Sequence, residues 1–100
     1  MLTKSFGDVV GTYYFNTNMI NIKLLLYGKL KTIIGNEMIS FEVEEGYNIA
    51  KLLDLLGEKF LEFKEIRKYA VCANNDAFID EEYKIKEGDV ISIILPASGG

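Results

Sequence analysis

The chain has 100 residues, of which 49% are hydrophobic and 26% are charged, and its formal net charge is −4. These values are typical of one small globular domain and argue against a disordered chain. Acidic residues outnumber basic ones by 15 to 11, which argues against nucleic acid as a partner. With no His and one Cys, one copy cannot build a Ser-His-Asp triad, a His-containing zinc site or a Cys-only metal cluster. We therefore expect other proteins to supply any catalytic groups.

The sequence favours a cytoplasmic location. Its longest apolar stretches, such as residues 24–27 and 93–96, are far shorter than the roughly 20 residues of a membrane span. The first 19 residues lack the basic start and apolar middle of a secretory signal. A single thiol offers no disulfide within the chain, as is usual for proteins of a reducing compartment.

Residues 1–18 differ in composition from the rest of the chain. They carry two charges and two glycines, so we predict a loosely ordered N-terminal extension, a domain over residues 19–96 and a flexible tail over residues 97–100. The stretch 12–15 is compatible with an extra edge strand, because aromatic and β-branched residues favour strands. Met19 is compatible with an alternative translation start.

Two strands are predicted near the start of the domain. Residues 20–27 alternate, with Ile22, Leu24 and Leu26 on one side of the strand. Residues 39–43 alternate in the same way and form a hairpin with the first strand. Between them, residues 29–34 fit a short helical turn that Gly35 closes.

A longer helix is predicted after residue 48. Asn48 is a favourable N-cap, and the apolar residues that follow have the i, i+3, i+4 spacing of one buried stripe: Ile49, Leu52, Leu53, Leu56 and Phe60. Gly57 weakens this helix, so we expect it to end near Phe60. A short helical or irregular piece follows, with Phe63 and Ile66 packed inward.

The remainder of the domain is predicted to be β-structure. Residues 70–73 and 77–79 form a short pair around a turn, and residues 90–95 form the most apolar strand, which Pro96 ends. This order predicts an α+β fold of the β-grasp type. Its mixed sheet has four to five strands and one main helix on one face. The first and last strands lie parallel and adjacent in the centre.

The sheet face opposite the helix is a candidate docking surface. If Ile22, Leu24 and Leu26 face the helix, then Leu25 and Tyr27 lie on the other face, with Ile94 beside them. Exposed contiguous apolar area often marks an interface, so we predict partner docking through Leu25, Tyr27 and Ile94. Phe78 is a further candidate, although the sequence does not set the register of its strand. The competing interpretation is that the N-terminal extension or another copy covers this patch.

The sequence ends in a run of small residues, Ala97, Ser98, Gly99 and Gly100. Fully extended, four residues span at most about 14 Å, enough to place a terminal carboxylate inside a partner's active site. Two glycines meet little steric resistance in a narrow tunnel. At average glycine usage, a terminal Gly-Gly pair arises by chance in roughly 1 of 200 chains.

From Met19 to Gly100 the chain resembles the sulfur-carrier subunits of molybdopterin synthase, in the MoaD/ThiS family of ubiquitin-like β-grasp proteins. The matching stretches are residues 22–28 (IKLLLYG), 30–35 (LKTIIG), 87–90 (EGDV) and 95–100 (LPASGG). The helical insert that ends at Gly35 is closer to the molybdopterin members than to the thiamine-pathway carriers. The chain departs from the family in its 18-residue leader and in one extra residue within residues 80–86.

The resemblance implies a sulfur carrier in molybdenum or tungsten cofactor synthesis that is not itself an enzyme. An E1-like enzyme that uses ATP would adenylate Gly100, and a sulfur donor protein would convert the adenylate to a thiocarboxylate. The tail residues Ala97, Ser98 and Gly99 would then enter the large catalytic subunit of the synthase. The carrier itself would bind no cofactor, no nucleic acid and no membrane.

Three alternatives remain open at this point. Related β-grasp proteins with the same ending act as protein modifiers, joined through the terminal glycine to target lysines. A sulfur carrier for thiamine or another pathway would keep the chemistry and change the acceptor. An interaction domain with an incidental Gly-Gly ending is the third.

Two further features of the sequence favour structural over functional interpretations. A single Cys in a short apolar strand favours Cys72 as core filling rather than a reactive thiol. The acidic run at residues 80–82 favours a solvated face, and we predict no metal site.

Overall fold

The computed structural model describes residues 18–96, so all but the last residue of the predicted extension and the whole predicted tail lie outside the described residues. Within these residues, five strands and three helices are separated by short loops and one 3-10 turn. In chain order they are β1 (Met19–Leu26), α1 (Lys29–Ile34), β2 (Met38–Glu44), α2 (Ile49–Lys59), α3 (Leu61–Ile66), the 3-10 turn η1 (Arg67–Tyr69), β3 (Val71–Asn74), β4 (Ala77–Ile79) and β5 (Val90–Ile94). Among the described residues, no helix has the length and apolar character needed to cross a membrane.

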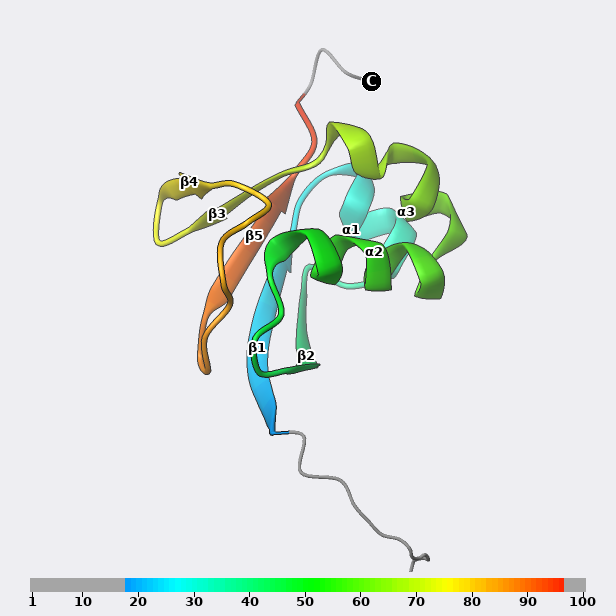
Figure 1. Cartoon of the computed structure of the whole chain (residues 1–100). Helices are drawn as coiled ribbons and strands as arrows, with labels where there is room; N and C mark the ends of the chain where they lie inside the picture. The colour runs from blue at the N-terminus through cyan, green and yellow to red at the C-terminus, as the bar shows by residue number, and fades with distance from the viewer. Residues whose placement is uncertain (1–17, 97–100) are drawn as a thin grey trace, which may run out of the picture.

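The five strands form one mixed sheet in the order β2-β1-β5-β3-β4. β1 is antiparallel to β2 and parallel to β5, whereas β3 is antiparallel to both β5 and β4. The predicted parallel pair in the centre of the sheet is therefore confirmed. Figure 1 shows β1 starting at one end of the sheet and β5 finishing at the other.

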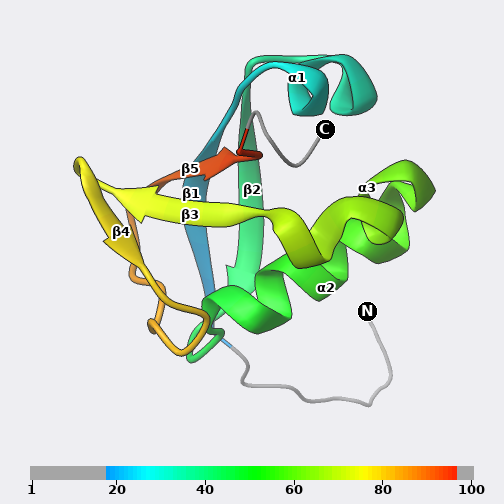
Figure 2. The ribbon, with the colours of Figure 1, turned by 90° about the horizontal axis from the view of Figure 1, so that it is seen from above.

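One face of the sheet packs against the helices and forms the core. Along β1 the predicted alternation is observed, because Ile22, Leu24 and Leu26 are almost completely buried. The predicted stripe of α2 lies on the same core, and most of its residues are fully buried. Figure 2 shows α2 and α3 together on one side of the strands. Burying each such side chain contributes about 1.5–3 kcal/mol, so this face dominates the stability of the domain.

The N-terminus of α2 is capped as predicted and is also closed by a distant loop. The side chain of Asn48 accepts a hydrogen bond of 2.9 Å from the backbone N–H of Lys51. The N–H of Ile49 donates to the carbonyl of Tyr83 at 3.1 Å, and that of Ala50 donates to the carbonyl of Glu81 at 3.0 Å. The first N–H groups of a helix have no partner within it, so this loop satisfies donors that would otherwise be lost.

The end of α2 is where Gly57 has its structural role. The helix ends at Lys59, as predicted, and the irregular piece after it consists of α3 and η1. A Cβ atom at Gly57 would lie 3.4 Å from the Cα of Lys64 in α3. The residue that weakens α2 locally therefore lets the two helices approach closely.

The ends of β1 and β2 differ by one residue from the predicted bounds, and three further details differ from the sequence prediction. β3 begins at Val71 and continues to Asn74, because Asn74 still pairs with Ala77 on one side and Ile91 on the other. β5 ends at Ile94, one residue before the predicted end. Ile85, in a segment with no predicted strand or helix, is 3% exposed and belongs to the core.

Candidate functional site

The sheet face away from the helices brings together the four predicted docking residues. Register pairs Leu25 of β1 with Ser92 of β5, and Ser92 with Ala73 of β3. Ala73 in turn pairs with Phe78 of β4. Side chains opposite one another in a sheet point to the same side, so Leu25 and Phe78 share this face with two small residues between them.

Exposure separates these residues from the core. Tyr27 is 51% exposed and Phe78 is 77% exposed, whereas Leu25 and Ile94 are half-buried on the same side. Leu25, Tyr27 and Ile94 gather around the central strands, and Phe78 lies at the β4 edge. The register confirms the predicted side of the sheet for Leu25 and Ile94, and it also places Phe78 on that side. Tyr27 follows the last residue of β1, and the docking role of all four residues stays a prediction.

Sequence reasoning missed two residues of the same face. Met38, 52% exposed, pairs with Leu25, and Val71, 39% exposed, pairs with Ile94. Met38 could have been found from the alternation of β2, since it has the parity opposite to Ile39. We call the complete surface the apolar face, and it consists of Leu25, Tyr27, Met38, Val71, Phe78 and Ile94.

The apolar face lies at the end of the sheet where β5 finishes. Ile91 and Ile93 of β5 are fully buried, so this strand packs against the core almost to its last residue, Ile94. Leu95 and Pro96 are the last described residues. The predicted tail residues Ala97, Ser98, Gly99 and Gly100 lie outside the described residues.

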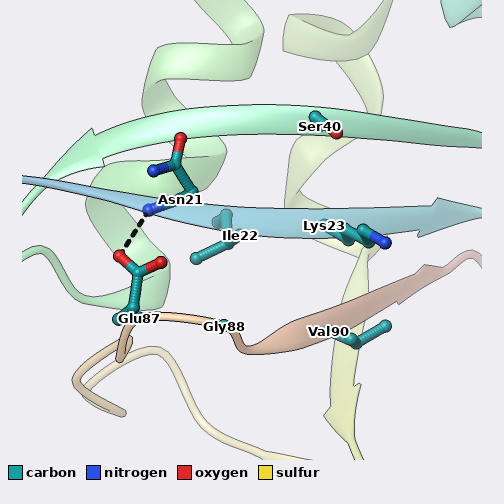
Figure 3. Close-up of a pocket in the computed structure, with 7 residues that line it drawn as sticks. All are labelled: Asn21, Ile22, Lys23, Ser40, Glu87, Gly88 and Val90. Carbon is teal, nitrogen blue, oxygen red and sulfur yellow. Dashed lines mark hydrogen bonds between the residues drawn. The ribbon is translucent and has the colours of Figure 1, made fainter.

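The other half of this sheet face is polar and contains a shallow hollow (Figure 3). It is lined mainly by Asn21, Lys23 and Ser40 together with the turn at residues 87–88. The backbone N–H of Asn21 donates to a carboxylate oxygen of Glu87 at 2.9 Å, and the N–H of Gly88 donates to the carbonyl of Asn21 at 2.8 Å. These bonds fix the turn that leads into β5, so the hollow helps to position the strand that leads to the apolar face.

Cys72 lies in the core, as predicted from its apolar strand. It is 2% exposed and pairs in register with the fully buried Ile93. Burial, followed by the nearby charge of Glu81, raises the pKa of the Cys72 thiol to about 12. Since the thiolate is the nucleophile, this thiol is unreactive at neutral pH.

In the acidic run at residues 80–82, the carboxylates of Asp80 and Glu81 have partners within the protein. A carboxylate oxygen of Glu81 lies 3.3 Å from the Arg67 guanidinium, and the carboxylate of Asp80 accepts the N–H of Glu82 at 2.9 Å. Within residues 18–96, no group of three or more His, Cys, Asp or Glu side chains is arranged to hold a metal ion.

Together, the strand order, the helix α2 across one face and the opposite apolar face define a ubiquitin-like β-grasp protein. The model of the ThiS family matches residues 24–100. The chain therefore belongs to the ThiS family. This agrees with the resemblance drawn from the sequence and covers the part of the chain that contains β5 and the Gly-Gly ending.

Curated relatives share most of their length with this chain. It is 32% identical over 85 residues to the molybdopterin synthase sulfur carrier subunit of Drosophila melanogaster, covering 82% of this chain and 93% of the relative. It is 29% identical over 85 residues to the subunit of the same name from Arabidopsis thaliana, covering 85% and 88%.

Solved structures confirm the fold. The small archaeal modifier protein 1 of Methanosarcina acetivorans superposes with a TM-score of 0.68 at 22% identity, covering 83% of this chain and 99% of that one. A ubiquitin from Caldiarchaeum subterraneum superposes with a TM-score of 0.58 at 13% identity, covering 83% of this chain and 100% of that one. At such low identity these likenesses establish the β-grasp fold alone.

Proposed function

We propose that this chain is a sulfur carrier in molybdopterin synthesis, the small non-catalytic subunit of a two-protein synthase. The observation that carries the proposal is the family match over residues 24–100, together with relatives named as molybdopterin synthase sulfur carrier subunits. The sulfur would be held as a thiocarboxylate on Gly100. Such a role fits a sequence with no His and with its one thiol in the core.

The fold supports this role because β5 joins a rigid body to the proposed carrier residue. β5 is paired on both sides, with β1 and β3, so its direction is fixed by two ladders. Gly100 is four residues beyond Pro96, a span of at most about 14 Å when extended. A partner that binds the globular domain can therefore receive Gly100 within a limited distance of that domain. Binding energy from the domain then serves to place the reacting group.

The apolar face is the proposed binding surface for the large catalytic subunit. It lies beside the end of β5, and its most exposed aromatic side chains are Tyr27 and Phe78. Aromatic residues in well-packed interfaces commonly supply much of the binding energy. Ser98 and Gly99, with Ala97, would then line the path of the tail into that partner.

The proposed chemistry begins with a free carboxylate, which is a poor electrophile. An E1-like enzyme would let a carboxylate oxygen of Gly100 attack the α-phosphorus of ATP, with pyrophosphate as the leaving group. A hydrosulfide equivalent (HS⁻) delivered by a donor protein would then attack the acyl carbon and displace AMP, leaving the thiocarboxylate. After sulfur transfer to a pterin precursor in the large subunit, hydrolysis would return the carboxylate.

A cytoplasmic location suits these partners and the free thiol.

The decisive experiment measures the intact mass of the chain isolated from cells that contain its own activating enzyme. Exchange of one oxygen for sulfur, localised to Gly100, is the expected result. The variant Cys72→Ala should give the same exchange, which separates a thiocarboxylate from sulfur bound at the cysteine. Deletion of Gly100 should abolish both the exchange and cofactor synthesis.

Three results would contradict the proposal. Conjugates that carry a Gly-Gly remnant on lysine, with no thiocarboxylate on the free protein, would assign the chain to the protein modifiers. Cofactor synthesis that survives deletion of Gly100 would remove the role of the tail. Thiocarboxylate formation with normal cofactor synthesis in cells lacking the chain would instead point to thiamine or another sulfur pathway.

A further inference from the structure

The apolar pattern of β5 leaves its register open in one direction. Ile91 and Ile93 are fully buried, and Leu95, which has the same parity, is partly buried against the same core. A slip of one residue would bring Ser92 into the core, and a slip that moved Asp89 into the place of Ile91 would bury a carboxylate. A slip of two residues in the other direction fits the pattern, because Ile93 and Leu95 would take the two buried places.

This slip would shorten the reach of Gly100. Each residue of a strand advances about 3.3 Å, so a slip of two residues would draw the tail back by about 7 Å. The four residues after Pro96 span at most about 14 Å, so roughly half of their reach would be lost. Pro96 would take the last place of the strand, where its missing N–H costs at most one bond of the ladder. The core alone therefore does not determine how far Gly100 extends from the domain.

Hydrogen bonds at the start of β5 distinguish the two registers. The carboxylate of Asp89 accepts hydrogen bonds from the Tyr83 hydroxyl and from the backbone N–H of Lys86, both at 2.9 Å. The backbone carbonyl of Asp89 accepts from the N–H of Lys23 in β1 at 2.9 Å. The Tyr83 hydroxyl in turn accepts from the side chain of Asn74 in β3 at 2.9 Å. Asp89 therefore links the start of β5 to both neighbouring strands.

The residues just before Asp89 hold the same turn. The N–H of Asn21 donates to the Glu87 carboxylate at 2.9 Å (Figure 3), and the N–H of Gly88 donates to the carbonyl of Asn21 at 2.8 Å. In the slipped register Ile91 would take the place of Asp89, and its side chain has no oxygen to replace the carboxylate. The turn therefore favours one of the two registers that the core allows.

We propose that Asp89 is a positioning residue for the carrier tail, because it holds β5 in the register that gives Gly100 its full reach. The inference rests on the activation step of the proposed function. In both registers β5 fills its two buried places with large apolar side chains, so Asp89 acts on the position of Gly100 rather than on the formation of the core. A carboxylate displaced by several ångström loses the alignment with the α-phosphorus of ATP that the reaction requires.

The test measures pyrophosphate release from ATP by the activating enzyme of the same organism, with the full chain as substrate. Asp89→Val should lower kcat at least about tenfold and change KM by less than about threefold, since the domain surface that binds the enzyme is retained. Asp89→Asn keeps an oxygen acceptor and should retain most of the rate. Glu82→Val is the matched control, because it makes the same charge change at an exposed residue of the preceding loop.

Changes in tail length separate positioning from damage to the fold. Insertion of a second Ala-Ser pair after Ser98 should restore kcat in Asp89→Val, because the added residues replace the two that the slip draws into the strand. Deletion of Ala97 and Ser98 from the otherwise wild-type chain should lower kcat to a similar extent. A purely structural role of Asp89 would not be compensated by a longer tail.

Nuclear magnetic resonance reads the register directly. Lys23 lies opposite Val90 in the native register. Asp89→Val should give backbone contacts between Lys23 and Ser92, which the slipped register brings opposite each other. Their absence would contradict the slip.

The outcomes distinguish the two proposals. If Asp89→Val has the wild-type kcat, or if its loss is not restored by the insertion, the inference fails while the proposed function stands. Full activity after deletion of Ala97 and Ser98 would also overturn the inference, and this result does not depend on the folding of any Asp89 variant. If Asp89→Val does not fold, Tyr83→Phe replaces it, with a smaller loss that the insertion should again restore. If the wild-type chain is not activated at all, both proposals fail.

Discussion

The guanidinium Nε of Arg67 lies 2.7 Å from a carboxylate oxygen of Asp54, which joins η1 to α2. The same guanidinium donates to the carbonyl of Ala50 at 3.0 Å and lies 3.3 Å from a carboxylate oxygen of Glu81. The Arg67 side chain is 22% exposed, so these contacts are partly shielded from solvent. One side chain thus links α2, η1 and the loop that caps α2.

The first prediction concerns this link. Arg67→Lys keeps the charge and loses the planar fork that reaches three partners at once, so we expect the free energy of unfolding to fall by about 1–2 kcal/mol. Urea denaturation followed by circular dichroism measures the change. Lys64→Arg, on the exposed side of α3, should leave the midpoint unchanged. Equal midpoints for Arg67→Lys and the wild type would show that the link contributes little.

The second prediction concerns the thiol of Cys72. Burial raises its pKa to about 12, so the native protein holds almost no thiolate at pH 8. Iodoacetamide should alkylate Cys72 at least 100-fold more slowly in the native protein than in the urea-unfolded chain, judged from a shift of about three pKa units together with burial. Mass spectrometry at timed intervals follows the reaction. Comparable rates in both states would mean that β3 opens readily.

The sequence predicted those parts of the fold that depend on local patterns. The period of two along β1 and the i, i+3, i+4 spacing of α2 were sufficient to assign their buried sides, and Asn48 marked the start of α2. The side of the sheet that carries Leu25 followed directly from that alternation.

What the sequence could not provide depends on contacts between distant segments. The link from Arg67 to Glu81 spans a loop whose course no local pattern specifies, and Ile85 is buried by that same course. Val71 joins the apolar face only because β3 pairs with β5 in one register, and a shift of one residue would turn it to the core.

The third prediction rests on a polar network beside β5. The hydroxyl of Tyr83 donates to a carboxylate oxygen of Asp89 at 2.9 Å and accepts from the side chain of Asn74 at 2.9 Å. Burial, followed by the hydrogen bond to Asp89, raises the pKa of the Tyr83 hydroxyl above its ordinary value of 10.0. The pKa of the Cys72 thiol is raised in the same direction, from 9.0 to about 12.

The sign of the pH effect follows from these shifts. Above pH 9 the unfolded chain begins to lose protons that the native protein still holds, so the unfolded state becomes relatively more favourable as pH rises. We expect the free energy of unfolding to be constant near pH 8 and to fall between about pH 9 and pH 12. Cys72→Ala should flatten this decline. A stability that rises over the same range would contradict both assignments.

Tyr83→Phe tests the network itself. It removes the hydroxyl and leaves the Asn74 side chain and the Asp89 carboxylate without this partner, so the free energy of unfolding should fall by about 1 kcal/mol at pH 7. Tyr69→Phe is the control, because Tyr69 is 47% exposed and its hydroxyl makes no hydrogen bond with another described side chain. Thermal unfolding of the two variants side by side gives the comparison.

The last prediction concerns the apolar face. Tyr27 is 51% exposed, so Tyr27→Glu should change the free energy of unfolding by no more than about 0.5 kcal/mol. The affinity for the large synthase subunit should fall at least about tenfold, because a charge would be buried in an apolar interface. Calorimetric titration and thermal unfolding measure the two effects on the same samples.

Leu61→Glu is the matched control for Tyr27→Glu. Leu61 is 73% exposed on α3, away from the apolar face, and the substitution makes the same change in net charge. It should leave the affinity unchanged, whereas Tyr27→Ala, which adds no charge, should still weaken binding because it removes the aromatic contact. Unfolding of Tyr27→Glu would place Tyr27 in the core. Equal losses for Tyr27→Glu and Leu61→Glu would mean that the large subunit senses net charge rather than this surface.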